Sequence, residues 1–316
     1  MGQTTKIQWA DATFNPWRGC TKVSAGCANC YAETLSRRNP GVMGVWGDNG
    51  TRVVASESKW REPLKWDREA EAAGVRRRVF FSLGDPFEDR EELEAPRRRL
   101  FDLIETTPNL DWLLLTKRPE NLEAMLPWTS DHAGEYRERY WNNVWLGVSA
   151  ENQEQADKRI PILLSIPAAV RFVSCEPMLG PVDFFAVPRP DVPHFQWRGE
   201  TGAIGPKDEP DDFVYQMKRG IDWIIFGGES GPNARPCDIQ WIRDGVKQCK
   251  QAGVKAFVKQ LGAAPIGDRA PGDGLPWGSG AGWGPHKDRW QLVLRDPKGG
   301  DMDEWPEDLR VREVPT

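Results

Sequence analysis

The stretch DWLLLTKRP, residues 111–119, shows the pattern on which the fold depends. It has about the length of a β-strand and is almost continuously apolar until it ends in polar and charged residues. A strand without a polar face is typical of a parallel sheet that is buried on both sides. Six other runs share this character, namely 12–17, 78–85, 143–152, 170–181, 222–232 and 254–262.

Helix-like segments separate several of these runs. They cover 95–106, 151–166 and 239–253, before the third, fifth and seventh runs. This alternation predicts βα units and a parallel sheet. No GxGxxG turn opens a helix after the first run, which disfavours a doubly wound dinucleotide fold. We therefore expect an α/β protein built as a parallel (β/α) barrel, complete or partial.

A chain of 316 residues suits one large barrel domain with insertions. We expect the barrel to cover 1–262. A lid-like insertion at about 184–220 is rich in proline and charge. The remaining segment, 263–316, is rich in glycine and proline and lacks a helical period, so we interpret it as a C-terminal extension that wraps one side of the barrel.

Composition limits the possible classes of protein. The chain is 39% hydrophobic and 28% charged, and no run approaches the roughly 18 apolar residues of a membrane span. The N-terminus lacks the layout of a secretory signal, so we expect a cytoplasmic protein in a reducing compartment, with no membrane partner. The net charge of −5 argues against a protein that coats nucleic acid nonspecifically, although a local basic groove stays open.

Three of the six cysteines fall within eleven positions of the stretch RGCTKVSAGCANCY, residues 18–31. They are Cys20, Cys27 and Cys30, and in a reducing compartment such clusters more often bind metal or do chemistry than form disulfides. With 3 histidines in the chain, a histidine-rich site is disfavoured. Structural zinc needs a fourth ligand, for which Asp11 or a distant cysteine is open. An iron–sulfur cluster with three protein ligands and one open iron needs none.

Polar residues at the carboxyl ends of the other runs are candidates for function, because active sites of barrels form at that edge. For each of them the alternative is a cap or an ordinary salt bridge. These candidates are Asp85, Lys117, Ser149, Glu151, Cys175, Glu176, Glu229, Ser230, Lys259 and Gln260.

Three cysteines in a loop after the first strand of a parallel barrel, with Tyr31 beside the last, resemble the radical S-adenosylmethionine enzymes. The spacing here is Cx6CxxC, whereas the usual pattern is CxxxCxxC. Over nearly the whole chain the sequence is similar to a phage and bacterial family of three-cysteine-motif proteins predicted to be such enzymes. It is distantly similar to spore photoproduct lyase and related DNA repair lyases. The stretches that carry this similarity are TFNPWRGC, GCANCYAE, SLGDPFED, LLTKRPEN, WLGVSAEN, VSCEPMLGP, FGGESGPNARP, FVKQLG and KGGDMDEWPEDLRVRE.

The resemblance implies a 4Fe-4S cluster ligated by the three cysteines and S-adenosylmethionine as cofactor. Cleavage of that cofactor would yield a 5′-deoxyadenosyl radical that abstracts hydrogen from a substrate. Lys117 is placed to pair with the cofactor carboxylate. The remaining residues expected near the cofactor are Asp85, Ser149, Glu151, Glu176 and Glu229. An electron donor such as flavodoxin or ferredoxin is an implied partner.

The other cysteines divide between chemistry and core. Cys175 ends the fifth run, where a thiol can return a hydrogen atom to a substrate radical; the alternative is a buried small hydrophobe. Cys249 lies on the predicted helix 239–253 and is expected in the core. Cys237 is expected in a loop.

Substrate identity is the least determined property. We expect DNA, RNA or a nucleotide as substrate for modification or repair, for which the 16 tryptophans and the lid-like insertion could offer stacking surfaces; the alternative is that the tryptophans fill the core of the barrel. If the protein is phage-encoded, it would act in a bacterial host cell. The alternatives are a peptide or small-metabolite substrate, and a non-catalytic module that binds zinc or an iron–sulfur cluster.

Overall fold

The fold is taken from a computed structural model, which describes residues 5–127, 142–188, 220–268, 282–286 and 289–315. Most of the lid-like insertion expected at 184–220 lies outside the described residues, because the description stops at residue 188 and resumes at residue 220.

The seven apolar runs each contribute a strand to one sheet, in chain order and without reversal. Its described pairs, β1 with β4, β4 with β5, β5 with β6, β7 with β8 and β8 with β10, are all parallel. This confirms the α/β class and fits a partial parallel barrel, because a doubly wound sheet reverses its strand order. The strands are β1 (Ala12–Thr13), β4 (Arg77–Phe80), β5 (Leu110–Thr116), β6 (Val144–Ser149), β7 (Val170–Cys175), β8 (Trp223–Gly227) and β10 (Lys255–Gln260).

The three predicted helices are also confirmed, as α5 (Glu94–Glu105), α7 (Gln153–Ser165) and α9 (Ile239–Ala252). Helix α9 has clear end signals. The Asp238 side chain accepts a hydrogen bond from the backbone N–H of Gln240, and Gly253 ends the helix in the left-handed region with φ 66°.

The chain divides into two compact units. The first contains Met1–Val148 and Ile166–Arg171. Its predicted first strand, 12–17, is wrong in part: it splits into β1 and β2 (Trp17–Arg18), and β2 pairs antiparallel with β3 (Val53–Val54) instead of joining the large sheet. Pro16 stands between the two segments, and a proline has no N–H to donate to a continuous ladder.

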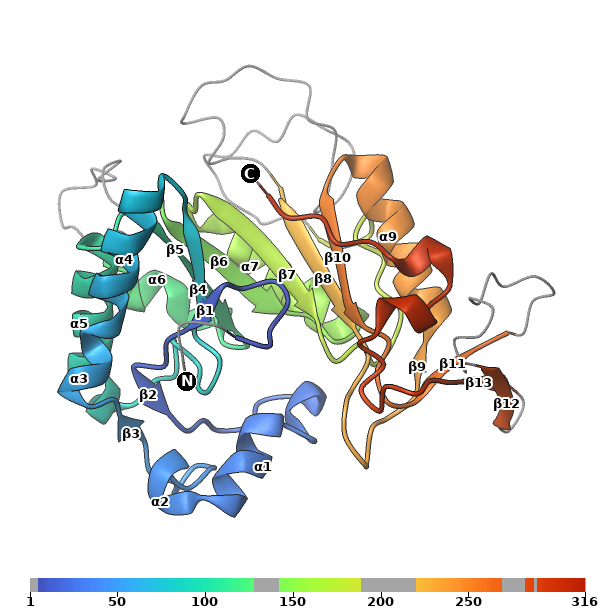
Figure 1. The fold of residues 1–316 in the computed structure, drawn as a ribbon, viewed down its shortest axis with the longest axis horizontal. Coiled ribbons are helices and arrows are strands. Elements are labelled where there is room, and N and C mark those ends of the chain that lie inside the picture. The colour runs from blue at the N-terminus through green and yellow to red at the C-terminus, as the bar shows by residue number, and fades with distance from the viewer. Residues whose placement is uncertain (1–4, 128–141, 189–219, 269–281, 287–288, 316) are drawn as a thin grey trace. The chain divides into compact units, whose positions relative to one another are not determined.

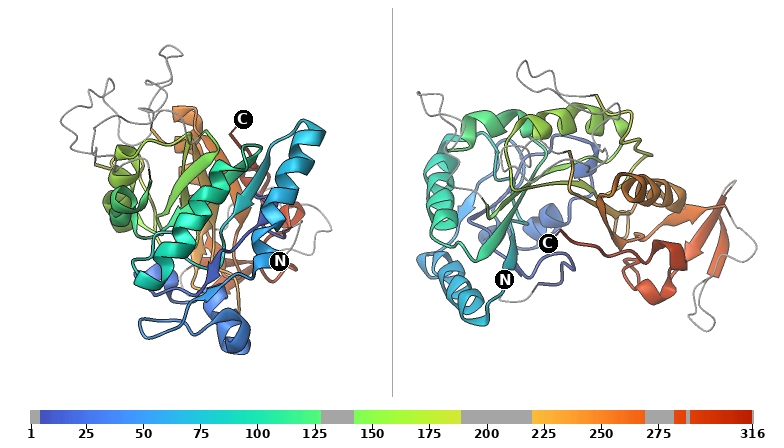
Figure 2. Two further views of the ribbon diagram at one scale, coloured as in Figure 1. Left: turned by 90° about the vertical axis from the view of Figure 1, so that its left-hand side faces the viewer. Right: turned by 90° about the horizontal axis from the view of Figure 1, so that it is seen from above.

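Helices cover the strands of the first unit. Helix α4 (Glu62–Ala73) packs against β4 and β5, and α5 lies on the same side of these strands (Figures 1 and 2). Beneath them Phe14 packs edge-on against Trp60 and Trp112, with ring centroids 5.3 and 5.8 Å away. The remaining helices of this unit are α1 (Tyr31–Arg38), α2 (Pro40–Met43), α3 (Glu57–Trp60), α6 (Leu122–Met125), and the 3-10 turns η1 (Ala25–Cys27), η2 (Glu91–Leu93) and η3 (Pro119–Asn121).

The second unit contains Ser149–Ser165 and Phe172–Thr316. Helix α9 packs on β8 and β10 so closely that a Cβ on Gly245 would lie 2.4 Å from the Phe226 ring. A second, four-stranded sheet has the order β12-β13-β11-β9. Its strands and the last two turns are β9 (Cys237–Asp238), β11 (Pro265–Gly267), β12 (Gly282–His286), β13 (Arg289–Val293), η4 (Met302–Glu304) and η5 (Glu307–Leu309).

The end of the chain pairs with the edge of β10. The N–H of Val258 donates to the carbonyl of Val311 at 2.8 Å, and the N–H of Glu313 donates to the carbonyl of Ala256 at 2.8 Å. The free edge of β10 is therefore covered by a backbone ladder, which is how native sheets protect an edge strand.

None of the helices in the described ranges combines the length and the apolar character that a membrane span requires.

Candidate functional site

The three clustered cysteines lie in a loop that leaves β2 and enters α1; residues 19–30 are called the thiol loop. Gly19 begins it with φ 114°, a conformation that favours glycine, and a Cβ there would lie 2.8 Å from the carbonyl oxygen of Thr51. Cys27 ends the short turn η1, and Cys30 is the residue before α1. The loop thus presents three thiols from a single connection.

Hydrogen bonds hold the thiol loop against the segment that follows β4. The N–H of Gly19 donates to the carbonyl of Leu83 at 3.1 Å, and the Tyr31 hydroxyl donates to the carbonyl of Ser82 at 2.6 Å. The side-chain carbonyl of Asn15 accepts from the N–H groups of Ser82 and Leu83, at 2.9 and 2.6 Å. Both ends of the loop are therefore fixed to one strand end.

A buried network of two carboxylates and two guanidinium groups lies beside the loop. Arg52 binds Glu88 through two hydrogen bonds, of 2.6 Å from Nε and 2.7 Å from Nη2. Arg118 pairs with Asp85 at 3.0 Å and with Glu88 at 3.5 Å. The network connects to the loop because the N–H of Thr21 donates to Glu88 at 3.0 Å and Arg118 donates to the carbonyl of Thr21 at 2.7 Å.

Asp85, expected near a cofactor, has its carboxylate occupied by protein donors. It accepts from the Thr116 hydroxyl at 2.7 Å and from the N–H groups of Phe87 and Lys117 at 3.0 and 3.1 Å, in addition to the Arg118 pair. This arrangement joins the ends of β4 and β5. Asp85 therefore acts as a positioning residue for Arg118.

Arg118 reaches the sulfur of Cys20, with 3.6 Å between Nη1 and Sγ. Burial and the Asp85 carboxylate nevertheless raise the pKa of Cys20 to about 12, and the Arg118 charge offsets only part of this. The thiol is therefore protonated at neutral pH in the metal-free chain. A cation that binds the sulfur must displace this proton.

Cys27 and Cys30 are partly exposed. Cys30 packs against a small apolar cluster of Ala32, Met43 and Leu83. Within the described ranges no group of three or more His, Cys, Asp or Glu side chains is arranged to hold a metal ion. The three thiols therefore share one loop without their sulfur atoms already being gathered as a metal site.

Lys117 is partly exposed directly after β5, and the structure records no ion pair for its ammonium group with any described residue. Its backbone is fixed by the hydrogen bond to Asp85. No carboxylate of a described residue therefore neutralises this ammonium group.

In the second unit, Ser149 is the last residue of β6 and Glu151 follows two positions later. Glu151 is buried and pairs with Arg159 at 2.9 Å, and Arg159 also donates to the carbonyl of Ser149 at 2.8 Å. The Ser149 hydroxyl is buried and has no hydrogen-bond partner among the described residues. A buried polar atom without a partner in the protein is a natural position for a ligand contact.

Cys175 ends β7 and its side chain is 0% exposed. Burial, together with the nearby Cys249 and Glu151, raises its pKa well above the ordinary value, so the group stays a thiol. Cys249 is buried on α9, which confirms its expected place in the core. Cys237 is also buried, but it lies in strand β9 and not in the loop that we expected.

The two remaining carboxylates predicted for the site are paired with cations of the same unit. Glu176 pairs with Lys259. Glu229 is buried and binds Arg235 through Nη2 at 2.6 Å and through Nε at 3.0 Å. In this arrangement each carboxylate is neutralised by its partner.

Comparisons with known proteins identify the family. A family model described as a protein of unknown function, DUF5131, matches residues 4–275, so the chain belongs to that family. The searches of curated proteins and of solved structures gave no significant match.

Proposed function

We propose that this member of the DUF5131 family is a radical S-adenosylmethionine enzyme whose 4Fe-4S cluster is ligated by Cys20, Cys27 and Cys30. The observation that carries the proposal is the thiol loop. It follows β2, a short strand just after the first strand of the sequentially ordered parallel sheet, and it is anchored to the segment after β4. The carboxyl edge of such a sheet is where parallel-barrel enzymes place their chemistry.

The donor set fits this cluster better than it fits a closed zinc site. Thiolates are soft ligands suited to iron–sulfur clusters. A structural zinc requires four protein ligands, whereas the loop supplies three thiols, and the described residues contain no preassembled group of three or more His, Cys, Asp or Glu side chains that would complete a zinc site. When bound, the cluster and cofactor would supply one-electron chemistry.

The buried ion-pair network beside the thiol loop supports the cluster ligands in this proposal. Arg118 donates toward the sulfur of Cys20, which favours the thiolate once the proton has left. Asp85 and Glu88 hold the guanidinium of Arg118 in place through their ion pairs. Because the two carboxylates already balance the two guanidinium groups, the charge of the thiolates would be balanced by the metal that displaces their protons.

Two of the residues predicted to bind the cofactor have polar atoms that make no ion pair or hydrogen bond with any described residue. These are the ammonium group of Lys117 and the buried hydroxyl of Ser149. We assign Lys117 to a carboxylate of the cofactor, and Ser149 to one of its hydroxyl or amino groups. Asp85, Glu151, Glu176 and Glu229 already pair with arginine or lysine and are assigned to positioning.

Cys175 is proposed to return a hydrogen atom to the substrate radical; this leaves a thiyl radical on its sulfur, which one electron from the electron donor and one proton from solvent would convert back to the thiol. Donation of a hydrogen atom requires an S–H bond, and burial keeps this group protonated. The substrate is proposed to be a nucleic acid or nucleotide, and the electron donor a protein such as flavodoxin or ferredoxin, working in the cytoplasm.

The test is anaerobic reconstitution with iron and sulfide, followed by reduction and measurement of 5′-deoxyadenosine. The wild-type chain should release it. Cys27→Ala should reduce release by at least about a hundredfold, because a site of three thiolates has no spare ligand. Cys175→Ala is the matched cysteine control. It should release 5′-deoxyadenosine at the wild-type rate but convert less of the nucleic acid or nucleotide substrate to product.

Two results would contradict the proposal. One is a wild-type chain that takes up one equivalent of zinc and cleaves no cofactor, which is the expectation for a non-catalytic module. The other is cofactor cleavage by Cys27→Ala at the wild-type rate. If product yield from Cys175→Ala equals that of the wild type, only the role of Cys175 fails.

A further inference from the structure

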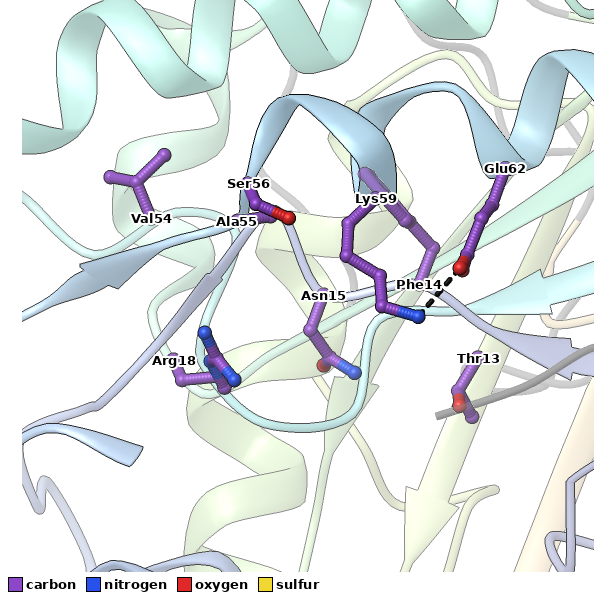
Figure 3. Close-up of a pocket in the computed structure, with 9 residues that line it drawn as sticks. All are labelled: Thr13, Phe14, Asn15, Arg18, Val54, Ala55, Ser56, Lys59 and Glu62. Atoms are coloured by element: carbon purple, nitrogen blue, oxygen red, sulfur yellow. Dashed lines mark hydrogen bonds and ion pairs between the residues drawn. The ribbon is translucent and has the colours of Figure 1, made fainter. Parts of the chain in front are cut away.

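The first unit contains a pocket that none of the residues assigned above to the cluster or the cofactor lines. It has a volume of about 310 Å³ and lies where β1 ends, between the β2–β3 hairpin and the beginning of helices α3 and α4 (Figure 3). Side chains of opposite character face it. Phe14 and Val54 are apolar, whereas Arg18, Lys59 and Ser56 are polar.

Two cations and one carboxylate line the pocket. The ammonium of Lys59 lies 2.5 Å from the carboxylate of Glu62, and Figure 3 marks this pair. The charge of Lys59 is therefore balanced within the wall. The net positive charge of the pocket lining therefore comes from Arg18.

Arg18 differs from the other arginines that the fold encloses. Arg52 and Arg118 bind Glu88 and Asp85, and Arg235 binds Glu229. The guanidinium of Arg18, in contrast, makes no hydrogen bond or ion pair with any described residue, and its Nε is buried. A buried donor without an acceptor costs free energy unless a ligand supplies one.

The backbone beneath Arg18 is held in place. Residue 18 pairs with Val53 across the hairpin, and the N–H of Ala55 donates to the carbonyl of Pro16 at 2.8 Å. The opposite wall is also fixed, since the Phe14 ring packs edge-on against Trp60. A guanidinium on such a support loses little freedom when it binds.

We propose that this pocket binds the phosphate group of a nucleotide unit, with Arg18 as its principal ligand. The planar fork of arginine matches two phosphate oxygens. The hydroxyls of Thr13 and Ser56 line the same pocket and are suitable further donors. The volume reaches the range of about 300 to 1,000 Å³ typical of ligand pockets, so it admits more than a carboxylate. The inference goes beyond the proposed function and requires neither cluster nor cofactor.

The experiment is calorimetric titration of the full metal-free chain with three probes: inorganic phosphate, adenosine 5′-monophosphate, and a 5′-phosphorylated single-stranded oligonucleotide. All three should compete for one site in the wild type. A free nucleotide as natural ligand predicts that the monophosphate binds at least as tightly as the oligonucleotide. A nucleic-acid end predicts the reverse order.

Arg18→Gln should weaken binding of each probe by about tenfold or more, because hydrogen bonds to a charged group are lost. Arg68→Gln removes the same charge from an exposed arginine of α4 and should change affinity by less than about twofold. Arg18→Lys keeps the charge without the fork and should show an intermediate loss. Melting temperatures identify any variant that fails to fold.

The proposal is overturned if the wild type shows no saturable binding of any probe up to about 10 mM, which corresponds to negligible affinity. It is also overturned if a folded Arg18→Gln or Arg18→Lys variant binds as tightly as the wild type. These outcomes are independent of cofactor cleavage, so they do not depend on whether the cluster proposal holds.

Discussion

Arg52 and Glu88 form an ion pair whose side chains are only 0% and 4% exposed. Taking two charges out of water is costly, and the cost is offset here by two hydrogen bonds between them and by the Thr21 N–H. Burial alone would raise the pKa of Glu88, but the hydrogen bonds and charge of Arg52 hold it below the ordinary value of 4.5. The pair ties the thiol loop and the β2–β3 hairpin to the segment after β4.

We expect Glu88→Gln to destabilise the metal-free protein by about 3 kcal/mol, because it leaves a buried guanidinium without its counter-ion. Glu57→Gln breaks the exposed pair with Arg99 and should cost less than about 1 kcal/mol. Chemical denaturation of both variants at neutral pH measures the difference. Equal costs would contradict the structural role of the buried pair.

The same pair predicts the direction of a pH dependence. A carboxyl group whose pKa is lowered on folding contributes stability that is present above its unfolded pKa and is lost as pH falls through the folded value. The stability gap between wild type and Glu88→Gln should therefore be constant above about pH 5 and should shrink in more acid solution. A gap that widens toward low pH would contradict the lowered pKa.

Individual functional residues can be predicted from the sequence when they lie close together along the chain. The thiols are found because three cysteines share eleven positions. Arg52 and Arg118 are not found, because their partners lie 36 and 33 positions away and nothing near them marks the pairing. The available signal for Arg118 is a basic residue at the end of an apolar strand, and Lys117 shows the same signal one position earlier.

Among the elements, the contact between α9 and β8 is the tightest that a helical glycine makes with a side chain in the described part of the chain. Gly245 on α9 faces the Phe226 ring of β8, and a Cβ would lie 2.4 Å from it. The ring is enclosed, with Phe184 at a centroid distance of 6.3 Å on another side. The glycine therefore sets the distance between helix and strand.

Gly245→Ala should destabilise the protein by about 1 to 3 kcal/mol, because overpacking outweighs the higher helix propensity of alanine. Gly41→Ala in α2 is the matched control, since a Cβ added at Gly41 would meet nothing within 4 Å. It should be neutral or stabilising by up to about 1 kcal/mol. A thermal melt of Gly245→Ala at or above the wild-type midpoint would refute the close packing.

Element prediction succeeds where the period of the sequence is strong. The buried strands and the three amphipathic helices lie within a few residues of their expected positions. The hairpin β2–β3 and the strands β9, β11 and β13 have two to five residues each, too short to show a period. Their pairing depends on partners far along the chain, as when β9 pairs with β11.

For the whole molecule, the two units carry different parts of the proposed chemistry. The first unit holds the thiol loop, Lys117 and the Arg18 pocket, and the second holds Ser149, Cys175 and the paired carboxylates. The parallel sheet could be predicted because near-continuously apolar runs alternate with helix-like segments, even though long connections follow β1 and β7. Which ligand the thiols bind cannot be predicted from strand order, because a parallel sheet hosts many chemistries.

The most direct test of the cluster assignment is X-ray absorption at the iron and zinc edges of the full chain, purified without oxygen. We expect about four iron atoms per chain with sulfur neighbours near 2.3 Å, and a spectrum that Cys20→Ala, Cys27→Ala and Cys30→Ala each abolish. One zinc per chain with four protein ligands, retained in any of these variants, would contradict it.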